Sequence, residues 1–289
     1  MVFASLLVTF REALEAALIV SIVAAYLRKV GQASLIRYLL AGAGFAIFAS
    51  IVLGWIIQVI YGGLSGVSAQ LFEGFASLTA TGVLTYMIFW MAKNAHMIKG
   101  KIEKKIEIAI TQGQMFSIAI IAFVAVVREG IETVLFLTAL FFLDPSGTAL
   151  GMVIGIGLVS ALSFLLLRGS YRLDVQHFFK YSSILLLVFA AGLAGYGVHE
   201  LIEAAESYGI GLGFLAQQAY NINPSSTANL LHEKGAVGSI LKALIGYDGN
   251  PEWLRVITYV SYWLMIGTYV FKTYSGKTLN GLFRVKHTT

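Results

Sequence analysis

The sequence contains no cysteine, few charged residues and only three prolines in 289 positions. The lack of cysteine excludes disulfides, thiolate metal sites and redox-active thiol pairs. Charged residues make up 12% of the chain, against roughly 25% in soluble domains, which excludes a soluble globular enzyme, a disordered tail and a coiled coil. The chain also has no G-x-x-x-x-G-K-[ST] loop for ATP phosphates. Any transport would therefore depend on a gradient or a partner reaction.

Hydrophobic residues dominate instead, at 58% of the chain, and the mean hydropathy is +0.80. They form stretches close to the ~20 residues that a helix needs to cross a bilayer. The sequence therefore predicts an all-α, polytopic membrane protein, and the first stretch is interpreted as a retained span rather than a cleaved signal. We expect seven spans, at about 2–27, 38–61, 71–95, 114–143, 148–168, 181–203 and 253–271.

The basic residues predict how the chain is oriented. The formal net charge is +5 and the isoelectric point is near 9.3, but the charges lie in short loops between apolar spans, which argues against nucleic-acid binding. Alternate loops and the C-terminal tail contain 14 of the 20 Lys and Arg residues, and the other loops contain almost none. Because basic loops stay in the cytoplasm, the N-terminus is predicted outside and the C-terminus inside.

An internal repeat organises the chain. Arg11-Glu12-Ala13-Leu14-Glu15 in the first span matches Arg128-Glu129-Gly130-Ile131-Glu132 in the fourth. Three spans per repeat invert the second copy, as in many secondary transporters. The single permease domain, residues 1–289, is thus predicted to comprise repeat 1 (about 1–95), repeat 2 (about 114–203), an outer loop (about 204–252) and a seventh helix (about 253–271). Short helices on the outer membrane face are expected in that loop.

Both motifs must lie deep in the bilayer. Ten residues precede Arg11, and thirteen separate the start of the fourth span from Arg128, so each helix crosses only if its motif is central. An unpaired ionisable residue there costs about 2.5–3.5 kcal/mol on insertion scales. Such residues are therefore expected to be paired, to face the protein interior or a wet cavity, and to be functional.

Helical spacing predicts the chemistry of the motifs. Glu12 and Glu15 share one helix face, Arg11 can pair with Glu15, and the second motif repeats this arrangement. Two facing motifs would offer only oxygen ligands with a net charge of about −2, which suits hard cations. The competing interpretation is that Arg–Glu pairs merely lock two helices together. Two copies in inverted halves favour the cation site.

The paired motifs in a seven-span chain resemble the oxidase-dependent iron permeases, which include fungal and bacterial iron permeases. Phe72-Glu73-Gly74, Met87-Ile88-Phe89-Trp90-Met91 and Gly246-Tyr247 add to the resemblance, which covers most of the chain. It implies that the iron-translocation ligands are four glutamates and that the motif arginines are Arg11 and Arg128; the glutamates are Glu12, Glu15, Glu129 and Glu132. One departure is Ala13, where the family usually has glycine, and its methyl group would limit close helix approach.

Other candidates lie at the predicted outer ends of spans. His199 and Glu203 are four residues apart on one face, next to Glu200, and could form either an entrance site for metal or a hydrogen-bonded interfacial pair. No second histidine follows, so this is not the zinc-protease motif. The resemblance favours Glu73 as a further outer ligand.

The sequence therefore predicts a plasma-membrane iron permease, not an enzyme, that carries iron into the cytoplasm and has no permanently bound cofactor. One alternative is an intramembrane di-metal oxidase, although neither motif has the histidine of di-iron bundles. Another is a transporter of a different hard cation such as manganese. The resemblance implies a separate oxidase or peroxidase partner. The sequence leaves open whether the iron is ferric or ferrous and whether the chain forms a homo-oligomer.

Overall fold

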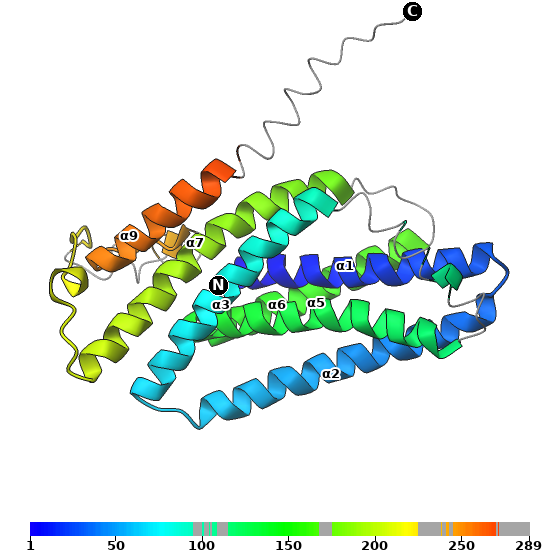
Figure 1. The fold of residues 1–289 in the computed structure, drawn as a ribbon, viewed down its shortest axis with the longest axis horizontal. Coiled ribbons are helices and arrows are strands. Elements are labelled where there is room, and N and C mark those ends of the chain that lie inside the picture. Colours follow the sequence, from blue (N-terminus) through cyan, green and yellow to red (C-terminus); the bar gives the residue numbers. More distant parts are fainter. Residues whose placement is uncertain are drawn as a thin grey trace, which may run out of the picture.

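The computed structural model describes residues 1–94, 115–167, 175–224 and 245–269, together with a few isolated positions between and after them. Long helices make up nearly all of these residues, and the only β feature among them is an isolated bridge between Gln218 and Glu252 (Figure 1). The prediction of an all-helical protein is thus confirmed. Most of the loop at 96–113, which the sequence predicts to be cytoplasmic, most of the tail and most of the predicted outer helix near 238–247 lie outside the described residues.

The long helices coincide with the predicted spans, with ends that differ by a few residues. They are α1 (Val2–Lys29), α2 (Ile36–Gly62), α3 (Val67–Asn94), α5 (Met115–Leu143), α6 (Pro145–Leu167), α7 (Val175–Ser207) and α9 (Trp253–Tyr262), which continues as a π-helical turn, η4 (Trp263–Gly267). Short 3-10 turns, η1 (Ala33–Leu35) and η3 (Gly213–Ala216), precede α2 and follow α7. The η3 turn lies in the segment that the sequence predicts to be outer, and it is helical as expected.

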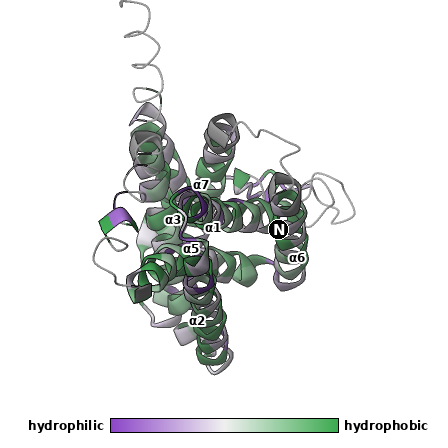
Figure 2. Ribbon diagram, turned by 90° about the vertical axis from the view of Figure 1, so that its right-hand side faces the viewer, coloured by the Kyte–Doolittle hydropathy of each residue, from purple (hydrophilic) through white to green (hydrophobic). Residues whose placement is uncertain are grey.

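Four segments of the described chain are long and apolar enough to cross a membrane: Ala33–Gly62, Val67–Met91, Pro145–Ser163 and Tyr181–Ser207. Helices α1 and α5 have comparable length, but each carries three charged residues near its middle. Large apolar side chains such as Phe45, Trp55 and Phe116 are exposed, and the helices are hydrophobic along most of their lengths (Figure 2). An apolar surface of this extent suits lipid, and the protein is membrane-embedded.

Helix packing follows a simple pairing. Helix α1 packs mainly against α6 and α5, α2 packs against α5, and α3 packs against α7, beside which it lies in Figure 1. Helix α9 packs on α7 outside this arrangement. The contacts place α1 and α5, the two motif helices, side by side in the middle of the bundle.

Glycines allow the closest of these contacts. A Cβ on Gly151 would lie 2.2 Å from the carbonyl oxygen of Val2, and one on Gly155 would lie 3.0 Å from that of Leu6, so α6 contacts the α1 backbone. This confirms the small-residue contact that the Gly151/Gly155 spacing predicts. On α2, Gly42 meets the backbone of Ala119 on α5 in the same way.

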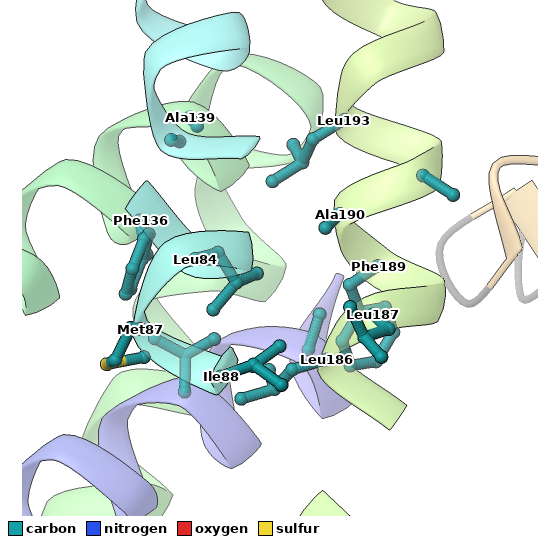
Figure 3. Close-up of a cluster of buried hydrophobic side chains, with 14 of the residues drawn as sticks. Leu84, Met87, Ile88, Phe136, Ala139, Leu186, Leu187, Phe189, Ala190 and Leu193 are labelled. Carbon is teal, nitrogen blue, oxygen red and sulfur yellow. The ribbon is translucent and has the colours of Figure 1, made fainter. Parts of the chain in front are cut away.

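The apolar core lies between one end of the bundle and the motifs. Residues from α3, α5 and α7 dominate this cluster, among them Leu84, Met87, Phe136 and Leu193 (Figure 3). Helix α1 contributes Ala4 and Val8, which precede the first motif. Met87 and Met91 are both buried here, as expected for core packing rather than thioether ligation.

Asp144 caps the start of α6. Its carboxylate accepts a hydrogen bond from the backbone N–H of Gly147 (2.9 Å), while Pro145 occupies the first helical position. This hydrogen bond lowers the pKa of the Asp144 carboxyl. Because the folded-state pKa is lowered, the ionised cap stabilises the protein at neutral pH, and its contribution is lost as the pH falls through that pKa.

We expect Asp144→Ala to destabilise the protein by about 1 kcal/mol, because the N–H groups of the first turn lose their acceptor. Asp144→Asn should keep most of the stability, since asparagine caps helices almost as well. Thermal unfolding in detergent, measured at neutral pH and near pH 4, checks this. Equal melting temperatures for the wild type and the alanine variant at neutral pH would contradict the capping role.

A second prediction concerns Gly130, the glycine of the second motif. A Cβ there would lie 1.9 Å from Ser50 Oγ and 2.7 Å from Ser50 Cβ on α2, so a methyl group would push α2 away from α5. Gly130→Ala should destabilise the protein by about 1–3 kcal/mol, as overpacking does. Gly44→Ala is the matched control because nothing lies within 4 Å of Gly44, and Ser50→Gly should relieve the clash. Thermal unfolding of all four chains gives the comparison, and a tolerated Gly130→Ala would refute it.

Candidate functional site

The first motif is completely enclosed. Arg11 Nε lies 3.2 Å from Glu15 Oε1, and Arg11 Nη1 lies 3.7 Å from Glu12 Oε1. The side chains of Arg11 and Glu12 are 0% exposed, and Glu15 is buried. The predicted i, i+4 pair is therefore present, and both of its side chains are buried.

The second motif repeats the pairing but is more open. Arg128 Nε donates a hydrogen bond to Glu132 Oε1 (2.9 Å) and lies 3.9 Å from Glu129 Oε1. Both glutamates are buried, whereas the Arg128 side chain is 39% exposed. The two motifs therefore share their chemistry along the helix and differ in what surrounds the arginine.

The carboxylates of the two motifs converge. One oxygen from each of Glu12, Glu15 and Glu129 lies within 4.8 Å of the others, the spacing of a group that can hold a metal ion. Glu132 belongs to the same buried motif but is engaged by Arg128 rather than included in this trio. Sequence reasoning anticipated four glutamates, and the structure brings three of them to one point, with the fourth held beside them.

Several polar atoms in this cluster have no hydrogen-bond partner among the described residues. They include both carboxylate oxygens of Glu12, one oxygen each of Glu15, Glu129 and Glu132, and all three guanidinium nitrogens of Arg11. Buried charged groups are costly unless they are paired, hydrogen-bonded or coordinated to a metal. An oxygen-only donor set with free lone pairs is suited to a hard cation.

A second polar cluster lies at the end of the bundle where α2 ends and α3 begins. Glu73 accepts hydrogen bonds from Tyr61 on α2 (2.7 Å) and from Tyr196 on α7 (2.5 Å). One phenol binds each carboxylate oxygen, so three helices are tied together at this residue. Glu200 lies one turn beyond Tyr196 on α7, at the same end.

His199 is held by carboxylates on both sides. Its Nε2 lies 3.3 Å from Glu203 Oε1 and its Nδ1 lies 2.8 Å from Glu252 Oε1, just before α9. Gln70 on α3 donates to the other oxygen of Glu203 (3.0 Å). In this arrangement neither ring nitrogen of His199 is open to a metal, so the contacts favour the hydrogen-bonded interfacial pair. A ligand role for His199 and Glu203 stays a prediction.

Sequence reasoning missed several partners of these residues. Tyr61, Tyr196 and Glu252 each hold a predicted site residue, and the Trp90 ring lies over the Arg128 guanidinium, 4.5 Å from its Cζ. Of these residues, only Tyr196 could have been linked to a predicted site residue from the sequence, because it lies four residues before Glu200 on the same helix face. The others come from helices distant in sequence.

Comparisons with known proteins identify the family of the chain. Residues 2–275 match the model of the iron permease FTR1 family. The chain is 42% identical over 257 residues to an uncharacterised protein of Archaeoglobus fulgidus, covering 89% of this chain and 90% of that protein. It is 32% identical over 264 residues to the ferrous iron permease EfeU of Escherichia coli O157:H7 (90% and 92% covered) and 31% identical over 264 residues to EfeU of Yersinia pestis (90% of each). No solved structure gives a significant match. The chain, matched by the family model over nearly its whole length, belongs to the iron permease FTR1 family.

Proposed function

We propose that this protein is an iron permease in which the glutamates of the two R-E-x-x-E motifs bind the ion during its passage. The observation that carries the proposal is the buried convergence of Glu12, Glu15 and Glu129 with free carboxylate oxygens. Relatives named ferrous iron permeases support iron as the substrate. Arg11 and Arg128 balance part of the negative charge while the site is empty.

An inverted repeat of three helices, followed by a seventh span, accounts for the packing. In this repeat, α1, α2 and α3 correspond to α5, α6 and α7. The contact between α2 and α5 then corresponds to the contact between α6 and α1, and the contact between α3 and α7 corresponds to itself. Gly42 meets Ala119, nine residues before Arg128, and Gly151 meets Val2, nine residues before Arg11. These matching contacts support a two-fold relation with the ion site near its axis.

The proposed path begins at the outer cluster. Glu73, Glu200, Glu203 and His199 meet the ion first and influence its apparent affinity, after which the ion reaches Glu12, Glu15, Glu129 and Glu132. From there it leaves to the cytoplasm. The ion moves either by alternating access, in which the two halves rock around the site, or by relay between carboxylates in a narrower pore.

The same proposal includes the membrane, the orientation and the partner of the protein. The permease lies in the plasma membrane with its N-terminus outside and its C-terminus in the cytoplasm, and it works with a separate oxidase or peroxidase component. Iron is its cargo rather than a resident cofactor. The alternatives are a manganese transporter that uses the same oxygen ligands and an intramembrane di-metal oxidase that uses the same carboxylates.

The orientation can be tested by labelling single cysteines, because the chain has none of its own. Ser65→Cys lies in the exposed turn before α3, and Gln32→Cys lies in the exposed turn after α1. An impermeant thiol reagent added to intact cells should label position 65 and should label position 32 only after the cells are opened. The reverse pattern would place the N-terminus in the cytoplasm.

Transport by the central site can be tested by measuring the uptake of external radioactive iron into proteoliposomes. Glu12→Gln, Glu15→Gln, Glu129→Gln and Glu132→Gln should each lower uptake by more than about tenfold, because removing one charge unbalances the buried cluster. Glu206→Gln is the matched control, since Glu206 is exposed on α7. Unchanged uptake in the Glu15 and Glu132 variants would contradict a ligand role.

The same vesicles separate the competing functions. Iron uptake that excess manganese does not suppress supports iron as the preferred ion, whereas stronger uptake of manganese would favour the other transporter. Oxygen consumption by the purified protein with ferrous iron, without uptake, would favour the di-metal oxidase.

A further inference from the structure

The two motif arginines have the same sequence spacing but different surroundings. Arg11 is 0% exposed, whereas the Arg128 side chain is 39% exposed. Each guanidinium pairs with the glutamate four residues later, so burial and not pairing distinguishes them. Arg11 is enclosed by packed helices, and Arg128 is the motif arginine that has room to move.

Trp90 covers the more open arginine. The Arg128 Cζ lies 4.5 Å from the centre of the indole ring, within the ~6 Å range of a cation–π interaction. Trp90 lies on α3, whereas the first motif lies on α1 and the second lies on α5. The ring therefore holds the guanidinium from a third helix, which itself packs mainly on α7.

Trp90 packs against the apolar core cluster, toward the end of α3 that is far from Glu73. Met87 precedes it by about one turn on α3, and Phe136 follows Glu132 by about one turn on α5; both belong to the apolar core cluster in Figure 3. Glu73 lies beyond this cluster, near the start of α3, and Trp90 lies near its end at Asn94. In the proposed orientation Trp90 lies toward the cytoplasmic end of α3.

We propose that Trp90, which already covers the Arg128 guanidinium while it pairs with Glu132, is a positioning residue that keeps this guanidinium in place when the transported cation takes over the Glu132 carboxylate. This inference rests on the proposed function. A cation bound by Glu132 repels Arg128 and competes for the same oxygen lone pairs. The indole face attracts a guanidinium without consuming a hydrogen-bond acceptor, so it offers Arg128 a resting place that does not compete with the ion.

The Trp90 ring also gives the two motif arginines different roles. A divalent cation cancels the net charge of about −2 that four glutamates and two arginines would carry, and a cation that takes Glu132 as a ligand competes with Arg128 for the same oxygens. Arg11 has no free space and stays with Glu15, whereas Arg128 can rotate against the Trp90 face. Ion release toward the cytoplasm follows when Arg128 returns to Glu132.

Transport kinetics in proteoliposomes test this role, with iron supplied as ferrous ion with ascorbate and, in parallel, as ferric citrate. Trp90→Leu should raise the half-saturation concentration about three- to tenfold, the range expected for losing a cation–π contact, with a smaller effect on the maximal rate. Trp90→Phe, which keeps an aromatic face, should recover much of the loss. Phe89→Leu is the matched control, because Phe89 is adjacent on α3 and packs against Tyr269 instead.

A double-mutant cycle distinguishes positioning from general packing. Equilibrium iron binding is measured for the purified wild type, Trp90→Leu, Arg128→Gln and the double variant. Trp90→Leu should weaken binding in the wild-type background and have no further effect once Arg128 is glutamine. The same loss in both backgrounds, or equal half-saturation for Trp90→Leu and Phe89→Leu, would overturn the inference while leaving the permease intact. A wild-type protein that neither binds nor carries iron would overturn the proposed function itself.

Discussion

Charged residues in the middle of α1 and α5 have to be compensated inside the protein, and the rest of the architecture depends on this constraint. The glutamates are buried, so each carboxylate needs a cation, a hydrogen-bond donor or a metal. The arginines of the two motifs provide part of the compensation along each helix. Oxygens of Glu12 and Glu129 that have no hydrogen-bond partner converge with Glu15, whose Oε1 pairs with Arg11, and this is where a cation is proposed to bind.

Compensation between motifs requires their helices to approach closely. Gly42, Gly151 and Gly155 allow backbone contact between α2 and α5 and between α6 and α1. Gly130 fills the same need within the second motif, where Ser50 leaves no space for a methyl group. The first motif has Ala13 at that position, so the two halves are similar in plan and differ in detail. Small residues therefore set the distances on which the charge pairing depends.

The outer and central polar clusters are separated by the apolar core of α3, α5 and α7. Glu73, which accepts hydrogen bonds from Tyr61 and Tyr196, lies at one end of this core. The motif glutamates of α5 lie at its other end. Apolar side chains therefore lie between the two polar clusters. Trp90 packs against this core and also covers Arg128.

The sequence alone determined the helical segments, the depth of the motifs and the pairing of Arg11 with Glu15 and of Arg128 with Glu132. These features depend on helix period and hydrophobic length, which act between residues close in the chain. Only the tertiary structure decided that Glu12, Glu15 and Glu129 converge while Glu132 stays with Arg128, that His199 is bound by Glu252, and that Trp90 covers Arg128. Helix period fixes neighbours within one helix, whereas contacts between helices depend on which faces pack together and how closely small residues let them approach.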